Sequence, residues 1–324
     1  MSRPIDSSRR RAFAKLAALS AAATGAFSGT IARADDAPKT LRIGYQKYGN
    51  FVALKARGSL EKRLAAQGVS VQWLEFPAGP QLLEGLNAGA VDVGTVGETP
   101  PIFAQAAGVD FVYVASEPPA PHAEAIVVPK DSAIRSVAEL RGKKVALNKG
   151  SNVHYLLVEA LKKSKLAWSD IQPVYLAPAD ARAAFVQGSV DAWAIWDPYL
   201  AAVERQTGAR QLTDANGIVR NVQYYLATRK IASGQPQLVK ALLEELNQVD
   251  AWARDNVSAV AAQLSPLVGL DAGTLETALK RTSYGVQPIA PATLTYQQQI
   301  ADTFTELKLI PKKLDVTEAR WNVA

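Results

Sequence analysis

The chain has 324 residues, of which 48% are hydrophobic, and it carries a net charge of +6 with no cysteine. Residues 1–34 hold five of those six positive charges, so the rest of the chain, at +1, lacks the basic surplus that nucleic-acid binding requires. The absence of cysteine excludes thiol nucleophiles, iron–sulfur clusters and cysteine-based zinc sites.

The first 34 residues predict an export signal. Arg9, Arg10 and Arg11 precede a run of small apolar residues, and Ala32-Arg33-Ala34 has the small-x-small pattern of a cleavage site. Interruptions by Ser, Thr and Gly make this run too weak for a stable membrane span. We therefore expect a periplasmic protein that begins at Asp35 after cleavage. The arginines suit the twin-arginine and the general secretory routes alike.

The remaining chain alternates short apolar strands with helices, which is typical of an α/β protein with parallel sheets. The predicted strands are Thr40–Tyr45, Val69–Phe76, Phe111–Ser116, Glu124–Pro129, Lys144–Leu147, Pro173–Leu176 and Val222–Thr228. The predicted helices are Phe51–Gln67, Gln81–Asn87, Ile102–Ala107, Ser136–Gly142, Val153–Ser164, Pro178–Gln187, Pro236–Asn256, Val257–Ser265, Ala272–Thr282 and Leu294–Leu309.

One stretch of this chain occurs twice. Gly89–Pro101 and Gly188–Tyr199 align at a constant offset of 99 residues. In each copy a helix ends at a glycine suited to a left-handed cap, a strand follows, and an acidic residue and a proline stand at its exit. Ordinary α/β packing could produce this pattern twice. Two such units also predict two lobes whose strand exits face a shared cleft, where α/β sheets bind ligands.

Two strands are expected to cross between these lobes. Glu124–Pro129 leaves the first lobe and Val222–Thr228 returns to it, so that two segments form a hinge that closes over a ligand. The predicted organisation is a signal peptide in residues 1–34, the first part of lobe I in 35–123, lobe II in 124–222, and the second part of lobe I with the C-terminal helices in 223–324.

Helices that begin directly at strand exits predict an anion site in the cleft. The N–H groups of their first turns are unpaired and carry a partial positive charge. Each start could be an ordinary cap, but the four together favour a small oxyanion. They are Gly79-Pro80, Thr99-Pro100, Ser151-Asn152 and Ala179-Asp180.

Two acidic residues at the strand exits are unexpected in an anion site, because carboxylates repel an anion. Glu98 and Asp197 either bind ammonium groups or hold the cleft through backbone N–H groups. A paired-carboxylate hydrolase would use the same residue types, but nothing in the sequence fixes their separation. Of two nearby tryptophans, Trp196 is the candidate to cover an apolar ligand tail and Trp193 is assigned to the core.

The sequence indicates neither a metal nor a cofactor. His122 and His154 are 32 residues apart, without metal-type spacing, and we interpret both as surface or hydrogen-bonding residues. The chain also lacks a phosphate-binding P-loop and a G-x-S-x-G nucleophile elbow. These observations favour a binding protein over an enzyme.

Six runs of sequence carry a resemblance to a known family. They are LRIGYQKYG (41–49), EFPAGPQLLEGLNAGAVDVG (75–94), GETPPIFAQAAG (97–108), VYVASEPPAPHAEAIVVPKDS (112–132), IQPVYLAPADARAAFVQGSVDAWAIWDPY (171–199) and SYGVQPI (283–289). Through them essentially the whole mature chain resembles the periplasmic aliphatic-sulfonate-binding proteins, the soluble receptors of bacterial ABC importers.

This resemblance implies a type II periplasmic binding protein fold, with two α/β lobes joined by a two-segment hinge, the sulfonate bound between them and no reaction catalysed. It implies a monomer whose partners are a small organic sulfonate anion and a membrane permease of an ABC importer. The ligand-contacting residues that it implies are Gln46, Gly79, Pro80, Glu98, Thr99, Ser151, Asn152, Trp196, Asp197 and Tyr224, with Ser283 and Tyr284 at the rim.

Alternatives remain open at this point. Relatives in the same superfamily bind taurine, nitrate, bicarbonate or thiamine precursors, and the fold does not separate them. If Glu98 and Asp197 face the cleft, they suit a zwitterionic amino-sulfonate. A desulfinase of the same fold relies on a cysteine, which this chain lacks. A sensor that passes an anion signal to a membrane receptor is a third class, which genomic adjacency to a permease and an ATPase would discriminate.

Overall fold

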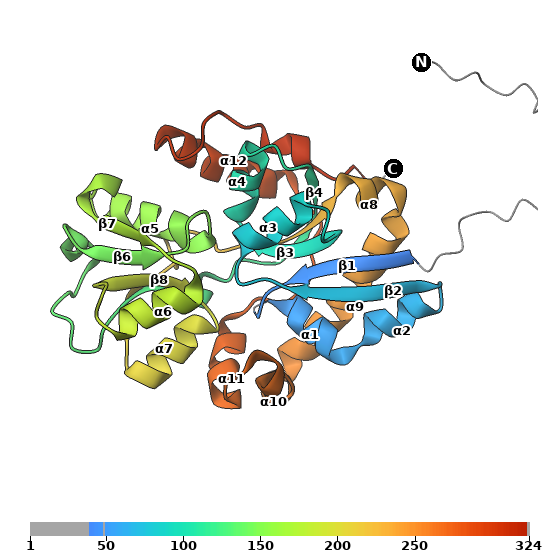
Figure 1. The fold of residues 1–324 in the computed structure, drawn as a ribbon, viewed down its shortest axis with the longest axis horizontal. Coiled ribbons are helices and arrows are strands. Elements are labelled where there is room, and N and C mark those ends of the chain that lie inside the picture. The colour runs from blue at the N-terminus through green and yellow to red at the C-terminus, as the bar shows by residue number, and fades with distance from the viewer. Residues whose placement is uncertain (1–38, 48, 323–324) are drawn as a thin grey trace, which may run out of the picture. The chain divides into compact units, whose positions relative to one another are not determined.

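The computed structural model describes residues 39–47 and 49–322. The predicted export signal lies outside these residues. The described chain forms two five-stranded sheets, one in each of two lobes that we call lobe I and lobe II (Figure 1). Among the described residues, no helix is both long and apolar enough to span a bilayer.

The sheet of lobe I combines strands from both ends of the chain. Its strand order is β2 (Val69–Glu75), β1 (Lys39–Tyr45), β3 (Val93–Gly97), β10 (Gln223–Thr228) and β4 (Phe111–Ser116). The helices of this lobe are α1 (Asn50–Arg57), α2 (Ser59–Ala65), α3 (Gly79–Asn87), α4 (Pro100–Ala106), α8 (Arg229–Gly234), α9 (Pro236–Asp255), α10 (Val257–Val268), α11 (Ala272–Arg281) and α12 (Pro291–Glu306).

The sheet of lobe II comes from one continuous segment. Its strand order is β7 (Gln172–Tyr175), β6 (Lys144–Leu147), β8 (Ala192–Trp196), β5 (Glu124–Val128) and β9 (Arg210–Asp214). Its helices are α5 (Asn152–Lys163), α6 (Pro178–Val186) and α7 (Tyr199–Thr207), and short 3₁₀ turns lie at Pro121–Ala123, Val137–Leu140, Trp168–Asp170 and, in lobe I, Val316–Ala319.

The two strands predicted to cross between lobes are the antiparallel strands of their sheets. β10 runs antiparallel to β3 and β4, and β5 runs antiparallel to β8 and β9, whereas the other pairs are parallel. The sheets are therefore mixed, because one antiparallel strand joins the predicted parallel strands in each lobe. A strand that enters a lobe directly from its neighbour needs no crossover helix, so it is free to run against the others.

The crossing segments themselves lie side by side. The N–H of Glu117 donates to the carbonyl of Gln223 at 2.9 Å, and the N–H of Ala120 donates to that of Asn221 at 3.1 Å. These backbone bonds tie the outgoing segment to the returning one. The lobe boundaries at residues 123/124 and 222/223 remain a prediction.

The duplicated sequence unit is also a structural repeat. Gly89 and Gly188 both take the left-handed conformation, with φ of 71° and 72°. In lobe I the carboxylate of Asp92 accepts the N–H of Arg42 at 2.9 Å, and in lobe II that of Asp191 accepts the N–H of Lys144 at 2.8 Å. Asp92 and Asp191, which precede the strands of the two units, thus fix the start of each strand against the neighbouring parallel strand.

Several elements differ from their predicted form. The single helix predicted over Phe51–Gln67 is two helices, because Gly58 takes the left-handed conformation between them at φ 63°. The helix predicted at Ser136–Gly142 is one 3₁₀ turn. Helices α7 and α8 and strand β9 were not predicted. The sequence of β9, RQLTD, is polar and half-buried at a sheet edge, so it shows no apolar strand pattern.

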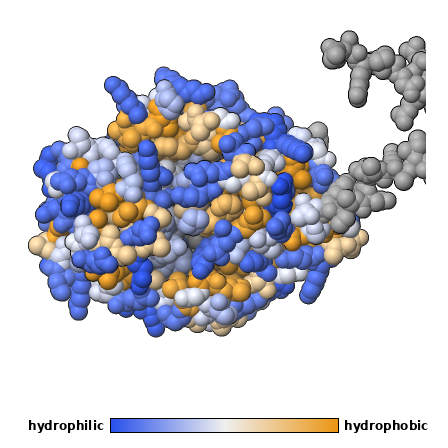
Figure 2. Space-filling view, viewed as in Figure 1, coloured by the Kyte–Doolittle hydropathy of each residue, from blue (hydrophilic) through white to orange (hydrophobic). Residues whose placement is uncertain are grey.

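The core consists of two clusters of buried aliphatic and aromatic side chains, one with members from both sheets and one within lobe I. Its largest fully buried members include Trp193, Tyr113, Tyr224, Tyr225 and Phe51. On the face shown in Figure 2, hydrophobic residues occur in separate patches among hydrophilic ones, as on ordinary water-exposed protein surfaces.

Candidate functional site

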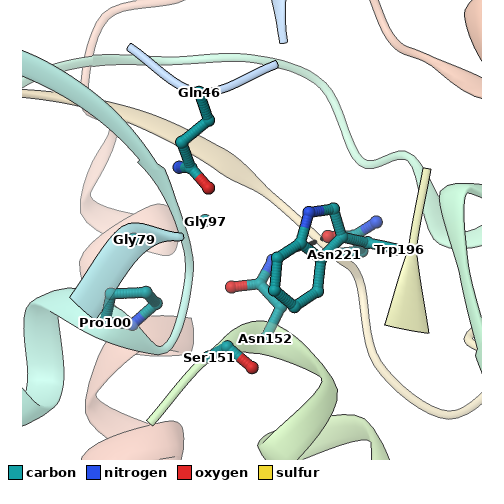
Figure 3. A pocket seen from close by; sticks show the side chains of 8 residues that line it. All are labelled: Gln46, Gly79, Gly97, Pro100, Ser151, Asn152, Trp196 and Asn221. Atoms are coloured by element: carbon teal, nitrogen blue, oxygen red, sulfur yellow. Dashed lines mark hydrogen bonds between the residues drawn. The ribbon is translucent and has the colours of Figure 1, made fainter. Parts of the chain in front are cut away.

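A pocket lies where strand exits of the two sheets meet. Its empty space is about 310 Å³, part of it open to solvent. Lobe I, lobe II and the returning segment all contribute to it (Figure 3). The lining residues are Gln46, Gly79, Gly97, Pro100, Ser151, Asn152, Trp196 and Asn221. We call this space the inner pocket.

Helix N-termini from both lobes face the inner pocket. Gly79 is the first residue of α3, and Ser151 is the N-cap residue of α5. The first-turn N–H groups of a helix have no partner within it and carry a partial positive charge. Helix α4 contributes less, since Pro100 and Pro101 lack N–H groups. Among the residues that the structure describes, no acidic side chain lines the inner pocket, so its polarity suits an anion.

Asn152 joins the lobes at this pocket. Its Nδ2 donates to Oδ1 of Asn221 at 2.7 Å, and its Oδ1 accepts the N–H of Thr99 at 3.3 Å. Asn221 in turn donates to the carbonyl of Ala120 at 2.8 Å. The two amides therefore couple the start of α5 to lobe I and to both crossing segments.

Gly97 makes this close approach possible. A Cβ atom at this position would lie 2.1 Å from the side-chain amide of Asn152, well inside van der Waals contact. Any larger residue at the end of β3 would push Asn152 away from lobe I. The glycine is therefore required by the contact between the lobes.

The remaining lining side chains shape the wall and the entrance. Gln46 follows β1 and donates from Nε2 to the carbonyl of Thr95 at 3.1 Å, which fixes the position of its amide. Trp196 ends β8, is 7% exposed and packs edge-on against Tyr199 with ring centroids 6.3 Å apart. Ser151 donates its hydroxyl to the carbonyl of Asn148 at 2.7 Å, so its oxygen is held at the start of α5.

Glu98 does not line the inner pocket. It is fully buried, and its carboxylate accepts the N–H of Val222 at 2.8 Å and the hydroxyl of Tyr296 at 3.2 Å. Burial raises its pKa to about 7, against the lowering effect of these bonds. Glu98 thus ties the exit of β3 to the returning segment.

Thr99 is also fully buried, and its Oγ1 has no hydrogen-bond partner among the described residues.

Asp197 likewise serves the architecture between the lobes. Its Oδ1 accepts the N–H of Ala201 at 2.9 Å, and Arg281 of α11 lies 3.5 Å away. The same Arg281 donates to Glu204 of α7 at 2.8 Å. Burial raises the pKa of Asp197 to about 7, although Arg281 opposes the shift. This residue holds α11 of lobe I against α7 of lobe II.

The other predicted residues also lie outside the lining. Pro80 is in the first turn of α3 behind Gly79. Tyr224 is fully buried and packs against Tyr113, with ring centroids 5.1 Å apart. Ser283 donates to the carbonyl of Pro119, in the outgoing segment, at 2.7 Å, and Tyr284 donates to that of Leu279, in α11, at 3.0 Å.

Five of the twelve predicted residues therefore line the inner pocket: Gln46, Gly79, Ser151, Asn152 and Trp196. Sequence reasoning missed three lining residues. Gly97 and Pro100 flank the predicted Glu98-Thr99, so the repeat itself could have indicated them. The only sequence signal for Asn221 is its residue type just before a predicted crossing strand. Asparagine tolerates the left-handed conformation, and Asn221 adopts it with φ 53°.

Neither His122 nor His154 lines the inner pocket. His154 is buried rather than at the surface, accepts the N–H of Gly150 at 3.2 Å and stacks on Phe103. Burial lowers its pKa to about 3, so it stays neutral. His122 lies 2.6 Å from Asp214. Among the described residues, no group of three or more His, Cys, Asp or Glu side chains is arranged to hold a metal ion.

Two α/β lobes, two crossing segments and a pocket at the strand exits between them define a two-lobed solute-binding protein of the periplasmic type. Comparisons with known proteins agree. The NMT1/THI5 like family model matches residues 64–256. A putative aliphatic sulfonates-binding protein of Escherichia coli (strain K12) is 46% identical over 290 residues, which is 89% of this chain and 90% of that protein.

Two solved structures agree with this match. The alkanesulfonate-binding protein SsuA from Xanthomonas axonopodis pv. citri, bound to MOPS, has a TM-score of 0.85 at 42% identity, over 88% of this chain and 99% of that one. The periplasmic aliphatic sulphonate binding protein SsuA from Escherichia coli has a TM-score of 0.81 at 45% identity, over 89% and 94%. The chain belongs to the aliphatic-sulfonate-binding proteins, and the predicted family and fold are confirmed.

Proposed function

We propose that this protein is the receptor of an ABC importer, which captures aliphatic sulfonates between its lobes and delivers them to a membrane permease. The composition of the inner pocket is the main observation that supports this proposal. The pocket presents the N-termini of α3 and α5 to a ligand and is bordered by the ring of Trp196, and none of its described lining residues is acidic. Such a site suits an SO₃⁻ group with a carbon tail. The protein is a binding protein, as are its relatives.

We assign direct contact with the sulfonate to Gln46, Gly79, Ser151, Asn152 and Trp196, together with Gly97, Pro100 and Asn221. Glu98, Thr99, Asp197 and Tyr224 support the site from behind. We further propose export to the periplasm through residues 1–34 and action as a monomer. The relatives named as periplasmic support the first of these proposals.

Calorimetric titration tests this function. The protein, purified after export, is unfolded and refolded to remove carried ligand and then titrated with ethanesulfonate, octanesulfonate, taurine, sulfate and nitrate. We expect tight binding of the alkyl sulfonates and weak binding of sulfate and nitrate. Tight binding of taurine alone would change the proposed ligand class from alkyl sulfonates to amino-sulfonates. Absence of binding to every sulfonate would refute the proposal.

A further inference from the structure

A second cavity adjoins the inner pocket and shares two side chains with it, Gln46 and Trp196. Its empty space is about 580 Å³, partly open to solvent. The other lining residues are Lys47, Glu75, Phe76, Pro77 and Tyr199. We call this space the outer compartment. Because it shares Gln46 and Trp196 with the inner pocket, a ligand whose anionic end lies at the helix N-termini can extend into it.

Aromatic rings from both lobes line the outer compartment. Trp196 and Tyr199 of lobe II meet edge-on, with their planes at 88°, and Phe76 comes from lobe I. Glu75, at the end of β2 in lobe I, lines the same compartment as Tyr199. Burial raises the pKa of Tyr199, and the charge of Glu75 raises it further. Faces of aromatic rings beside a carboxylate are the usual surroundings of a bound organic cation.

Glu75 is the one acidic residue among the described residues that line either space. Tyr45 donates its hydroxyl to Oε2 of Glu75 at 3.1 Å and so anchors it from lobe I. The Nζ of Lys47 lies 3.8 Å from Oε1, and the two side chains are 40% and 44% exposed. An exposed ion pair of this length is weak, so a ligand cation can replace the ammonium of Lys47.

We propose that the outer compartment receives the sulfonate's tail and that Glu75, with the rings of Trp196 and Tyr199, selects tails that carry a cationic nitrogen. This inference rests on the proposed sulfonate site in the inner pocket. It moves the recognition of a cationic group from Glu98 and Asp197, which are committed to partners within the protein, to an acidic residue at the entrance.

Two isosteric ligands test the role of Glu75. One is trimethylammonio-propanesulfonate, which carries a permanent positive charge, and the other is its neutral isostere, in which a quaternary carbon replaces the nitrogen. Both are titrated into the wild-type protein, Glu75→Gln and Glu84→Gln. Glu84 is exposed on α3, outside both cavities, and its substitution makes the same change in charge.

We expect Glu75→Gln to weaken binding of the ligand with the cationic tail about tenfold and to leave the affinity for the isostere with the uncharged tail within about twofold of wild type. Glu84→Gln should change neither affinity. Binding of the neutral isostere also shows that each variant is folded. Equal effects on both ligands would overturn the inference and leave the proposed function intact. Selective weakening of a tail with a second sulfonate by Lys47→Gln, without any effect of Glu75→Gln, would assign the compartment to anionic tails. If wild-type protein bound neither isostere but bound ethanesulfonate, the inference would fail and the proposed function would stand, whereas absence of binding to every sulfonate would refute both.

Discussion

Asn152 connects the lobes at the inner pocket, and its replacement by alanine tests whether this connection stabilises the ligand-binding arrangement. The variant loses the 2.7 Å bond to Asn221 and the 3.3 Å bond from Thr99. A buried hydrogen bond contributes about 1 kcal/mol, and leaving its partner unpaired costs roughly 1–3 kcal/mol. The bond from Thr99 is long and counts for less. We estimate a loss of about 2 kcal/mol, which corresponds to about 30-fold weaker sulfonate binding.

Calorimetric titration of four variants measures this effect. Asn148→Ala is the matched control, because Asn148 is also 8% exposed but donates only within lobe II, to the carbonyl of Leu176 at 3.4 Å. We expect its affinity to stay within about threefold of wild type. Asn221→Ala and the double variant with Asn152→Ala complete a double-mutant cycle, in which the two losses should not add. Wild-type affinity of Asn152→Ala, or strictly additive losses, would refute the reasoning.

Three further substitutions test the contacts around the site. Gly97→Ala places a Cβ atom 2.1 Å from the Asn152 amide, so we expect sulfonate affinity to fall about tenfold or more; unchanged affinity in the same titration would contradict the close contact. Burial raises the pKa of Glu98 from 4.5 to about 7, so the unfolded chain releases this proton first and the unfolding free energy falls as pH rises between these values. In urea unfolding, Glu98→Gln should reduce that fall by ~1–3 kcal/mol; equal slopes in both proteins would argue against it. Arg281→Gln leaves the buried carboxylate of Asp197 without its cation and should speed ligand release about tenfold in stopped-flow fluorescence, whereas an unchanged rate would show that this pair does not hold the lobes together.

The inner pocket also explains why the sequence could indicate part of the site and no more. Gly79, Ser151 and Asn152 stand at starts of helices that follow strands, and this position can be read from the order of residues alone. Glu98 and Asp197 stand at equivalent strand exits, yet both point into the protein. Their partners, Val222, Tyr296 and Arg281, lie 84 to 198 residues away in the sequence.

The sequence by itself determined most of the elements and their repetition. Apolar periodicity, turn glycines and the Asp92 and Asp191 positions are local features, and they specify helices, strands and two equivalent units. The family resemblance was also present in the sequence, and the comparisons confirm it.

Only the tertiary structure decided which polar groups meet. The antiparallel direction of β5 and β10, the amide contact above Gly97 and the meeting of Glu75 and Tyr199 in one cavity all depend on how distant segments pack. Local patterns encode the form of an element and the side that it buries. They do not encode its partner, because the energy of a buried polar group depends on what lies against it from elsewhere in the fold.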